Sequence, residues 1–112
     1  MKQKEYKMPG LFNITETHTN YHLRNRDIKK IDVLYDLGGD CYKIADTEHF
    51  KTFVCVSGSC DFCFEKDGIT EQISLENGTN KVETGKGICV EIKNYTSETK
   101  IVVNYLEDAK NE

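Results

Sequence analysis

The stretch FKTFVCVSGSCDFCFEKDGITEQISL, residues 50–75, decides the fold class of this chain. Its first part, residues 50–56, is rich in aromatic and β-branched side chains and ends at Ser57-Gly58. A second strand, residues 60–66, ends at Asp67-Gly68, a dipeptide typical of tight β-hairpins. The chain then continues with alternating apolar residues, so the stretch predicts three antiparallel strands joined by short turns.

The rest of the chain repeats this pattern of short strands and turn signals. In residues 28–36, Ile31, Val33 and Tyr35 alternate with a second set of side chains, as expected of a strand with two faces. No long segment has the period of a helix, and regularly spaced short strands are typical of a sandwich or barrel. The third strand of the quoted stretch is residues 69–75, and further strands are expected at residues 81–83, 88–92 and 100–106.

Length and composition indicate one compact domain. The chain has 112 residues, of which 38% are hydrophobic, and this is enough for one core but not for two. We expect a single domain over residues 1–112, with its core at about residues 28–106. Residues 1–27 form a polar N-terminal segment, and the charged tail, residues 107–112, is expected to fray.

The charge and hydropathy of the chain exclude several classes of partner. A formal net charge of -4 argues against a nucleic-acid-binding protein. No apolar run reaches the length that spans a bilayer, so no membrane partner is expected. The first seven residues are polar and lack the apolar core of a signal peptide, which predicts a cytoplasmic protein.

Five cysteines are present, and two of them form a C-x-x-C pair, Cys60 and Cys63. Such a pair is found in redox and metal sites. Residues three apart on a strand point to opposite faces, however, so the two sulfurs should diverge, which favours ordinary packing. A redox role stays open. Neither a second C-x-x-C nor an H-x-H pair exists, so no metal site and no cofactor are expected.

Four segments together resemble one known family, the WxcM-like cupins that act as dTDP-4-keto-6-deoxyhexose 3,4-ketoisomerases. Their order and spacing match the opening strand, the core hairpin, the Asp-Gly hairpin and the closing segment of that family. The resemblance implies an all-β, single-domain cupin, a double-stranded β-helix or jelly roll. It also implies a homodimer that binds a nucleotide or nucleotide-sugar in the mouth of the barrel. The segments are IKKIDVLYDL (28–37), TFVCVSGSCDF (52–62), EKDGITEQISL (65–75) and VEIKNYTSETKIVVNYL (90–106).

The chain departs from that family where its catalytic histidines lie. The family motif R-G-x-H-A-H precedes the Ser-Gly turn, and in this chain it falls on residues 41–46, where only the Ala matches. The two histidine positions hold Ile44 and Asp46, and an isoleucine has no proton chemistry. Cys89 stands where the family has Trp. The departures count against catalysis more than against binding.

Three residues are candidates to replace the missing acid–base pair. The family reaction moves a sugar carbonyl from C4 to C3 through an enediol, which requires one group to remove a proton from carbon and another to protonate oxygen. Asp46 is a candidate base, and His49 lies close enough in sequence for Asp46 or Glu48 to orient its ring. Tyr35 aligns with a family tyrosine near the ligand, although its alternation fits core packing equally well. A solvent-exposed His49 at a strand end is the simpler interpretation.

Three further residues are candidates for ligand binding. Lys43 and Lys51 can contact a phosphate as point charges, although most lysines are simply solvated. Glu91 matches the closing motif of the family and either contacts the ligand or only lines the barrel.

Three functions therefore compete. The missing histidines favour a catalytically degenerate binding module that holds or sequesters a nucleotide or nucleotide-sugar. This evidence favours a protein that is not an enzyme over one that is. The second is an active ketoisomerase with relocated acid–base groups. The third is a structural or interaction domain without a ligand.

Overall fold

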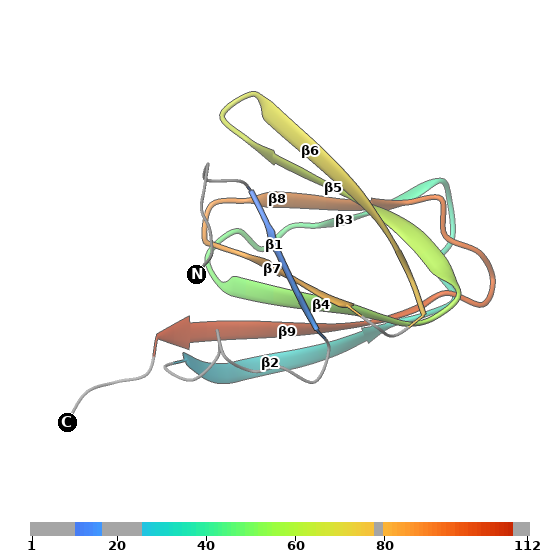
Figure 1. Ribbon diagram of the computed structural model, residues 1–112, viewed down its shortest axis with the longest axis horizontal. Coiled ribbons are helices and arrows are strands. Elements are labelled where there is room, and N and C mark those ends of the chain that lie inside the picture. The colour runs from blue at the N-terminus through green and yellow to red at the C-terminus, as the bar shows by residue number, and fades with distance from the viewer. Residues whose placement is uncertain (1–10, 17–25, 78–79, 109–112) are drawn as a thin grey trace, which may run out of the picture.

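The protein is a sandwich of two antiparallel sheets in the computed structural model, which describes residues 11–16, 26–77 and 80–108 (Figure 1). No helix occurs in these ranges, and hence none that is long and apolar enough to cross a membrane. The five-stranded sheet has the order β1-β7-β4-β9-β2, and the four-stranded sheet has the order β3-β8-β5-β6. The strands are β1 (Asn13–Glu16), β2 (Arg26–Leu34), β3 (Cys41–Ile44), β4 (Phe50–Ser57), β5 (Ser59–Lys66), β6 (Ile69–Glu76), β7 (Asn80–Thr84), β8 (Cys89–Lys93) and β9 (Lys100–Asp108).

Every strand expected from the sequence is present, and two more were missed. β1 and β3 have only four residues each and carry little alternation, so their pattern gave no signal. The C-terminal boundary also differs from the expectation. β9 pairs with β2 as far as Asp108, so residues 107 and 108 belong to the sheet and not to a frayed tail. Of the polar segment 1–27, residues 1–10 and 17–25 lie outside the described ranges.

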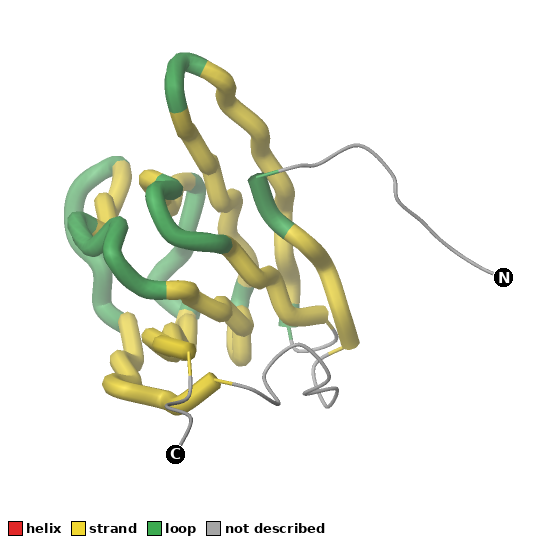
Figure 2. The backbone as a smooth tube through the Cα atoms, turned by 90° about the vertical axis from the view of Figure 1, so that its left-hand side faces the viewer, coloured by secondary structure: helices red, strands yellow, loops and turns green. Residues whose placement is uncertain are grey.

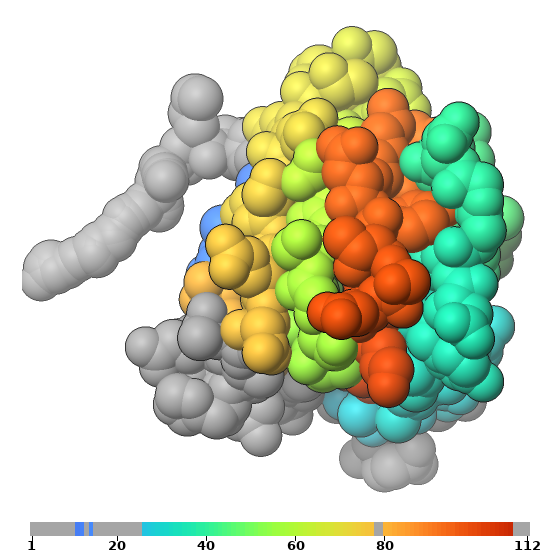
Figure 3. Space-filling model, turned by 90° about the vertical axis from the view of Figure 1, so that its right-hand side faces the viewer, coloured from blue at the N-terminus to red at the C-terminus, as the bar shows by residue number. Residues whose placement is uncertain are grey.

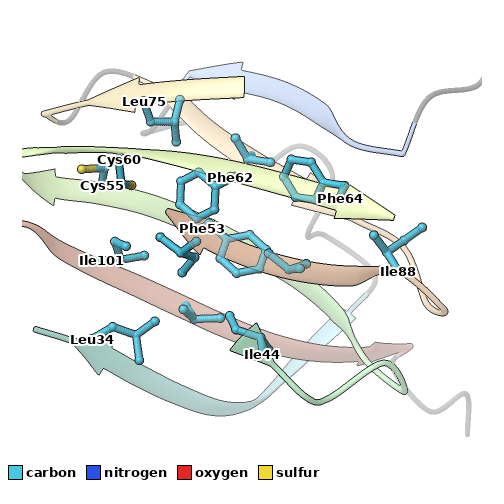
Figure 4. Close-up of a cluster of buried hydrophobic side chains, with 14 of the residues drawn as sticks. Leu34, Ile44, Phe53, Cys55, Cys60, Phe62, Phe64, Leu75, Ile88 and Ile101 are labelled. Carbon is cyan, nitrogen blue, oxygen red and sulfur yellow. The ribbon is translucent and has the colours of Figure 1, made fainter. Parts of the chain in front are cut away.

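The core lies between the two sheets (Figure 4). Phe53 from the larger sheet meets Phe62 from the smaller one, with ring centroids 5.2 Å apart. Phe64 stacks on Phe62 at 6.3 Å and on Phe12 at 4.8 Å, so the chain just before β1 is attached to the same core. Burial of aromatic side chains of this kind is the largest favourable contribution to such a fold. As expected from the alternation, Cys60, Phe62 and Phe64 are all buried, whereas Cys63 lies on the opposite face and contacts Gln72.

The face of β2 that turns toward the core is the less hydrophobic of its two faces. Of the two sets in its alternation, Ile31, Val33 and Tyr35 form the more hydrophobic one. Pairing with β9 instead places Leu34 opposite buried Ile101, and Ile31, Val33 and Tyr35 are more than half exposed. β2 is an edge strand with only one neighbour, so the register of its pairing, and not its own hydropathy, decides which face turns inward.

One end of the sandwich is closed by three connections that lie side by side (Figure 3). The Ser57 hydroxyl donates to the Glu98 carbonyl at 2.6 Å, and the Tyr95 hydroxyl donates to the Gly38 carbonyl at 2.8 Å. Gly58, with φ +71°, packs so closely on the backbone of Thr99 that a Cβ atom there would lie 2.9 Å from it. The other end, where β4 begins and β9 ends, faces the viewer in Figure 2.

Candidate functional site

A chain of hydrogen bonds centred on His49 lies at the end of the sandwich where β4 begins. The Nδ1 atom of His49 is 2.7 Å from Oδ2 of Asp46, and its Nε2 atom is 3.1 Å from Oε2 of Glu107. The imidazole is therefore held between two carboxylates, one on the β3–β4 connection and one on β9. Carboxylates only accept hydrogen bonds, so a ring with both nitrogens protonated satisfies both. We call Asp46, His49, Lys51 and Glu107 the His49 cluster.

The backbone around Asp46 holds its carboxylate in place. Burial alone would raise the pKa of Asp46, but hydrogen bonds from the Glu48 amide and the His49 ring outweigh it and lower the pKa below its ordinary value. The amides of Glu48 and His49 donate to Oδ1 at 2.7 and 3.2 Å. The carboxylate is thus fixed in its ionised form, which suits it to orient an imidazole.

Lys51 lies beneath this turn and is completely buried. Its Nζ atom donates to the carbonyl of Asp46 at 2.6 Å and to the carbonyl of His49 at 3.3 Å. Desolvation lowers the pKa of Lys51. The ammonium group supports the turn that carries Asp46 and His49, and in this conformation it is not exposed to a ligand.

Beside the His49 cluster, the two sheets end at the edge strands β2 and β3, and polar side chains on their inner faces are accessible to solvent. These strands are not paired with each other, and each lies at the edge of its own sheet. Register places Lys30 and Asp32 of β2 on the same inner face as buried Leu34, and Tyr42 of β3 on the same inner face as buried Ile44. These inward-facing side chains are nevertheless accessible: 61% of Lys30, 38% of Asp32 and 37% of Tyr42 is exposed. We call Lys30, Asp32, Tyr42 and Tyr105 the β2–β3 opening.

Tyr105 forms the inner wall of the opening. It pairs with Lys30 across β9 and β2, and the Lys30 Nζ atom lies 4.9 Å from the centre of its ring. Burial raises the pKa of Tyr105 to about 12, and the negative charge of the adjacent Asp32 carboxylate adds to the rise. The phenol therefore stays protonated at neutral pH. The ring of His49 meets that of Tyr105 edge-on, with centroids 6.1 Å apart, so the opening and the His49 cluster adjoin.

A separate hollow of about 480 Å³ lies on the outer face of the four-stranded sheet. Lys43, Glu91, Cys63 and Gln72 form one row across its four strands, in register from β3 to β6. These side chains alternate with buried Phe62 and Phe64 or their paired neighbours, so they point away from the barrel interior. No residue of the His49 cluster or of the β2–β3 opening lines this hollow.

The six residues singled out from the sequence thus fall in three places. Asp46 and His49 come together directly, with Lys51 beneath them. Lys43 and Glu91 lie on the outer face of the smaller sheet. Tyr35 directly follows the last residue of β2 and is 58% exposed, so it belongs to neither group.

Five polar residues that complete this end of the molecule were not predicted from the sequence: Lys30, Asp32, Tyr42, Tyr105 and Glu107. Asp32 belongs to the set that alternates with Ile31, Val33 and Tyr35, and Tyr105 lies inside an apolar run, KIVVNYL, that is typical of a core strand. Tyr105 had one usable signal, because a tyrosine in such a run requires a partner for its hydroxyl when buried. Among the residues described, no group of three or more His, Cys, Asp or Glu side chains is arranged to hold a metal ion.

The fold is similar to that of solved sugar 3,4-ketoisomerases. A 3,4-ketoisomerase from Helicobacter canadensis is 22% identical, with 90% of this chain and 86% of that one covered and a TM-score of 0.70. WlaRA, a TDP-fucose-3,4-ketoisomerase from Campylobacter jejuni, is 17% identical, with 89% and 84% covered and a TM-score of 0.69. A mutant of the 3,4-ketoisomerase QdtA from Thermoanaerobacterium thermosaccharolyticum, in complex with TDP-4-keto-6-deoxyglucose, is 12% identical, with 94% and 86% covered and a TM-score of 0.71.

These neighbours confirm the jelly-roll fold and agree with the resemblance seen in the sequence. No family model matches the chain, and a search of curated proteins found no match. At these identities the likeness concerns the fold, and the function has to be argued from the site.

Proposed function

We propose that this protein binds a nucleotide-sugar of the TDP-sugar type at the end of the sandwich formed by the His49 cluster and the β2–β3 opening, and that it does not isomerise the sugar at the rate of an ordinary ketoisomerase. Its structural neighbours include a TDP complex and a TDP-4-keto-6-deoxyglucose complex. One observation carries the proposal: polar side chains that face inward remain accessible at an unpaired sheet edge. All five cysteines are free thiols, which fits the cytoplasm that we propose as its location.

The loss of catalysis is argued from the positions that align with the family histidines. Ile44 is buried in the core, where it packs as a hydrophobic side chain. Asp46 points to His49, and its ionised carboxylate is already engaged by two amides. A positioned acid–base group contributes about a hundred- to ten-thousand-fold to a proton transfer, so loss of both histidines removes most of the enhancement.

One arrangement favours the alternative of an active isomerase. His49 is oriented by Asp46 at 2.7 Å, as a general base is oriented in catalytic triads. In such a reaction a neutral His49 ring, with Nε2 released from Glu107, would take the proton from sugar C3, and a second group would protonate the C4 oxygen to form the enediol. Protonation of C4, together with loss of the proton from the C3 hydroxyl, then gives the 3-keto sugar with no net oxidation.

Binding and turnover are separated by two measurements on the intact protein. Titration calorimetry with dTDP and with dTDP-glucose tests binding, and a rise in melting temperature with ligand concentration provides an independent check. Incubation with dTDP-4-keto-6-deoxyglucose, followed by NMR, tests turnover. Binding without a 3-keto product supports the proposal. Turnover at about one per second, within the ordinary enzyme range, supports the isomerase. In that case His49→Ala should abolish the turnover. Absence of binding to dTDP and to dTDP-glucose, together with no turnover of the keto sugar, supports the third hypothesis, a domain without this ligand.

We also propose that the protein is a homodimer that pairs through the outer face of β2. Ile28, Ile31, Val33 and Tyr35 form a stripe along this face, each more than half exposed. Val33 pairs with Val102, and Val102 pairs with Val54, so the stripe continues across the sheet. An apolar stripe of this kind on an edge strand is typical of a surface that a partner covers, and a second copy of the chain presents the same stripe.

A further inference from the structure

The β2–β3 opening holds acceptors, donors and an aromatic ring on three strands, and none of these residues takes part in the His49 cluster. Asp32 and Lys30 lie on β2, Tyr105 on β9 and Tyr42 on β3. We propose that this opening is the ligand-binding subsite, in which the Asp32–Tyr105 pair binds hydroxyl groups of the sugar and the ring of Tyr42 packs against the planar base. This inference rests on the proposed function and assigns residues to it.

The Asp32–Tyr105 pair has the chemistry that recognises a sugar hydroxyl. Tyr105 and Asp32 lie on the same inner face of the neighbouring strands β9 and β2, and each is close to Lys30. The phenol can donate and accept a hydrogen bond, and the carboxylate can accept. Hydroxyl groups of a sugar donate and accept, so one hydroxyl can satisfy Asp32 while its own oxygen accepts from the Lys30 ammonium, which lies 3.7 Å from Asp32 Oδ2. Because the phenol remains neutral at physiological pH, the pair offers fixed hydrogen bonds and not a second charge.

The position of Tyr105 makes it a binding residue and not only a core residue. Its side chain is largely buried, yet both of its polar neighbours, Asp32 and Lys30, are accessible from the open edge. A hydrogen bond made there is shielded from water on one side, which strengthens it. The adjoining His49 ring lies 6.1 Å away, close enough for a bound sugar to reach both.

Tyr42 is more exposed than its apolar neighbours on the inner face of the sheet. Ile44 on the same strand and Ile92, its paired neighbour, are both buried, whereas Tyr42 is 37% exposed. An aromatic ring left accessible at a rim is a stacking surface, and stacking of a base on such a ring contributes about tenfold or more to binding. The planar base is therefore assigned to the rim and the sugar to the inner wall.

Titration calorimetry with two compounds separates the two parts of the subsite. We expect Tyr105→Phe and Asp32→Asn each to weaken dTDP-glucose binding about tenfold, the loss of one hydrogen bond, and to change dTDP binding less than about twofold. We expect Tyr42→Ala to weaken both compounds to the same extent, and Tyr42→Phe, which keeps the ring, to bind like the wild type. Asp36→Asn, an exposed aspartate just beyond β2, is the control for Asp32→Asn.

The outcomes distinguish this inference from the proposed function. If the wild type binds dTDP-glucose but the Tyr105, Asp32 and Tyr42 variants bind it equally well, the opening is not the subsite and only the inference falls. The inference also falls if Tyr105→Phe weakens dTDP as strongly as dTDP-glucose, which would indicate a structural effect. If the wild type binds neither compound, the proposed function falls and the assignment falls with it. Circular dichroism and melting curves establish that each variant is folded.

Discussion

The Nε2 atom of His49 lies 3.1 Å from Oε2 of Glu107, and this contact joins the turn before β4 to the end of β9. The two residues are 58 positions apart in sequence, so the contact forms only when the sandwich is complete. Glu107 also lies 4.0 Å from Lys29 of β2, which brings a third strand into the same end of the molecule.

Replacement of Asp46 should change stability in a pH-dependent way. Its folded pKa lies below the ordinary value of 3.8, so its contribution is complete above that value and is lost as the pH falls through the folded pKa. We expect Asp46→Asn to lower the free energy of unfolding by about 1 kcal/mol at pH 7, with a difference that shrinks below about pH 4. Urea unfolding at several pH values measures it. An equal loss at neutral pH and at about pH 2.5 would refute the role of the charge.

Lys51 should affect stability in the alkaline range. Burial lowers its folded pKa below 10.5, so the unfolded chain binds the proton more tightly and the wild type gains stability as the pH rises through the folded pKa toward 10.5. Lys51→Met lacks this gain. We therefore expect the stability of the wild type relative to Lys51→Met to rise with pH above neutrality. Lys100→Met, at an exposed position, is the control and should show no such trend. A pH-independent difference for Lys51→Met would count against a buried ammonium.

Gly58→Ala should be strongly destabilising. Its φ of +71° is unfavourable for any residue with a Cβ atom, and that atom would lie 2.9 Å from the Thr99 backbone, which cannot easily move. Left-handed strain together with overpacking should cost about 2–5 kcal/mol of unfolding free energy. Gly38→Ala, where an added Cβ would meet nothing within 4 Å, is the matched control and should differ from the wild type by well under about 1 kcal/mol. Similar stabilities for both variants would contradict the close approach at the Gly58 turn.

The five thiols should react in two classes. Cys55 and Cys60 are buried, and burial raises the pKa of both, so neither forms a reactive thiolate in the folded protein. Cys41 is exposed, and Cys63 and Cys89 are partly exposed. We expect these three thiols to react with a disulfide reagent such as dithionitrobenzoate under native conditions, and all five after denaturation. Mass spectrometry identifies the protected pair, and fast native labelling of Cys60 would show that β5 is packed differently.

The dimer proposal makes a direct prediction about mass. Sedimentation equilibrium at micromolar concentration should give twice the chain mass of 12.9 kDa. Val33→Asp places a charge in the middle of the exposed stripe and should give a monomer that keeps the β circular dichroism spectrum. Lys43→Asp, on the outer face of the other sheet, should leave the mass unchanged. A monomeric wild type would reject the proposal.

The strands in the centre of the fold were predictable because local and tertiary signals agree there. Phe62 and Phe64 alternate on a strand that ends in an Asp-Gly turn, and both are buried as expected. On β2 the two signals disagree: the alternation favours the face of Val33, yet Leu34 enters the core because β9 sets the register. No single-sequence pattern contains that information, since it depends on a strand at the far end of the chain.

The candidate site was predictable only where its members are close in sequence. Asp46 and His49 are three residues apart, and their contact follows from a tight turn. Tyr105 and Glu107 reach the same region through pairing of β9 with β4 and β2, so nothing near Asp46 in sequence indicates them. Lys43 and Glu91 pair with each other across β3 and β8, but on the outer face of the sheet, because Ile44 and Ile92 occupy the inner one.

On β2, the residue that stabilises the core is different from the residues that can contact a ligand. Only Leu34 of this strand is part of the core, so changes at positions 30 and 32 alter what lines the opening and leave the packing of Phe53, Phe62 and their neighbours untouched. Mutations that destroy a core are eliminated by loss of folding, whereas mutations at a solvent-exposed edge are not. β2 is therefore the strand on which substitutions can change the lining of the opening at little cost to the core, and where directed evolution of a new binding specificity should begin.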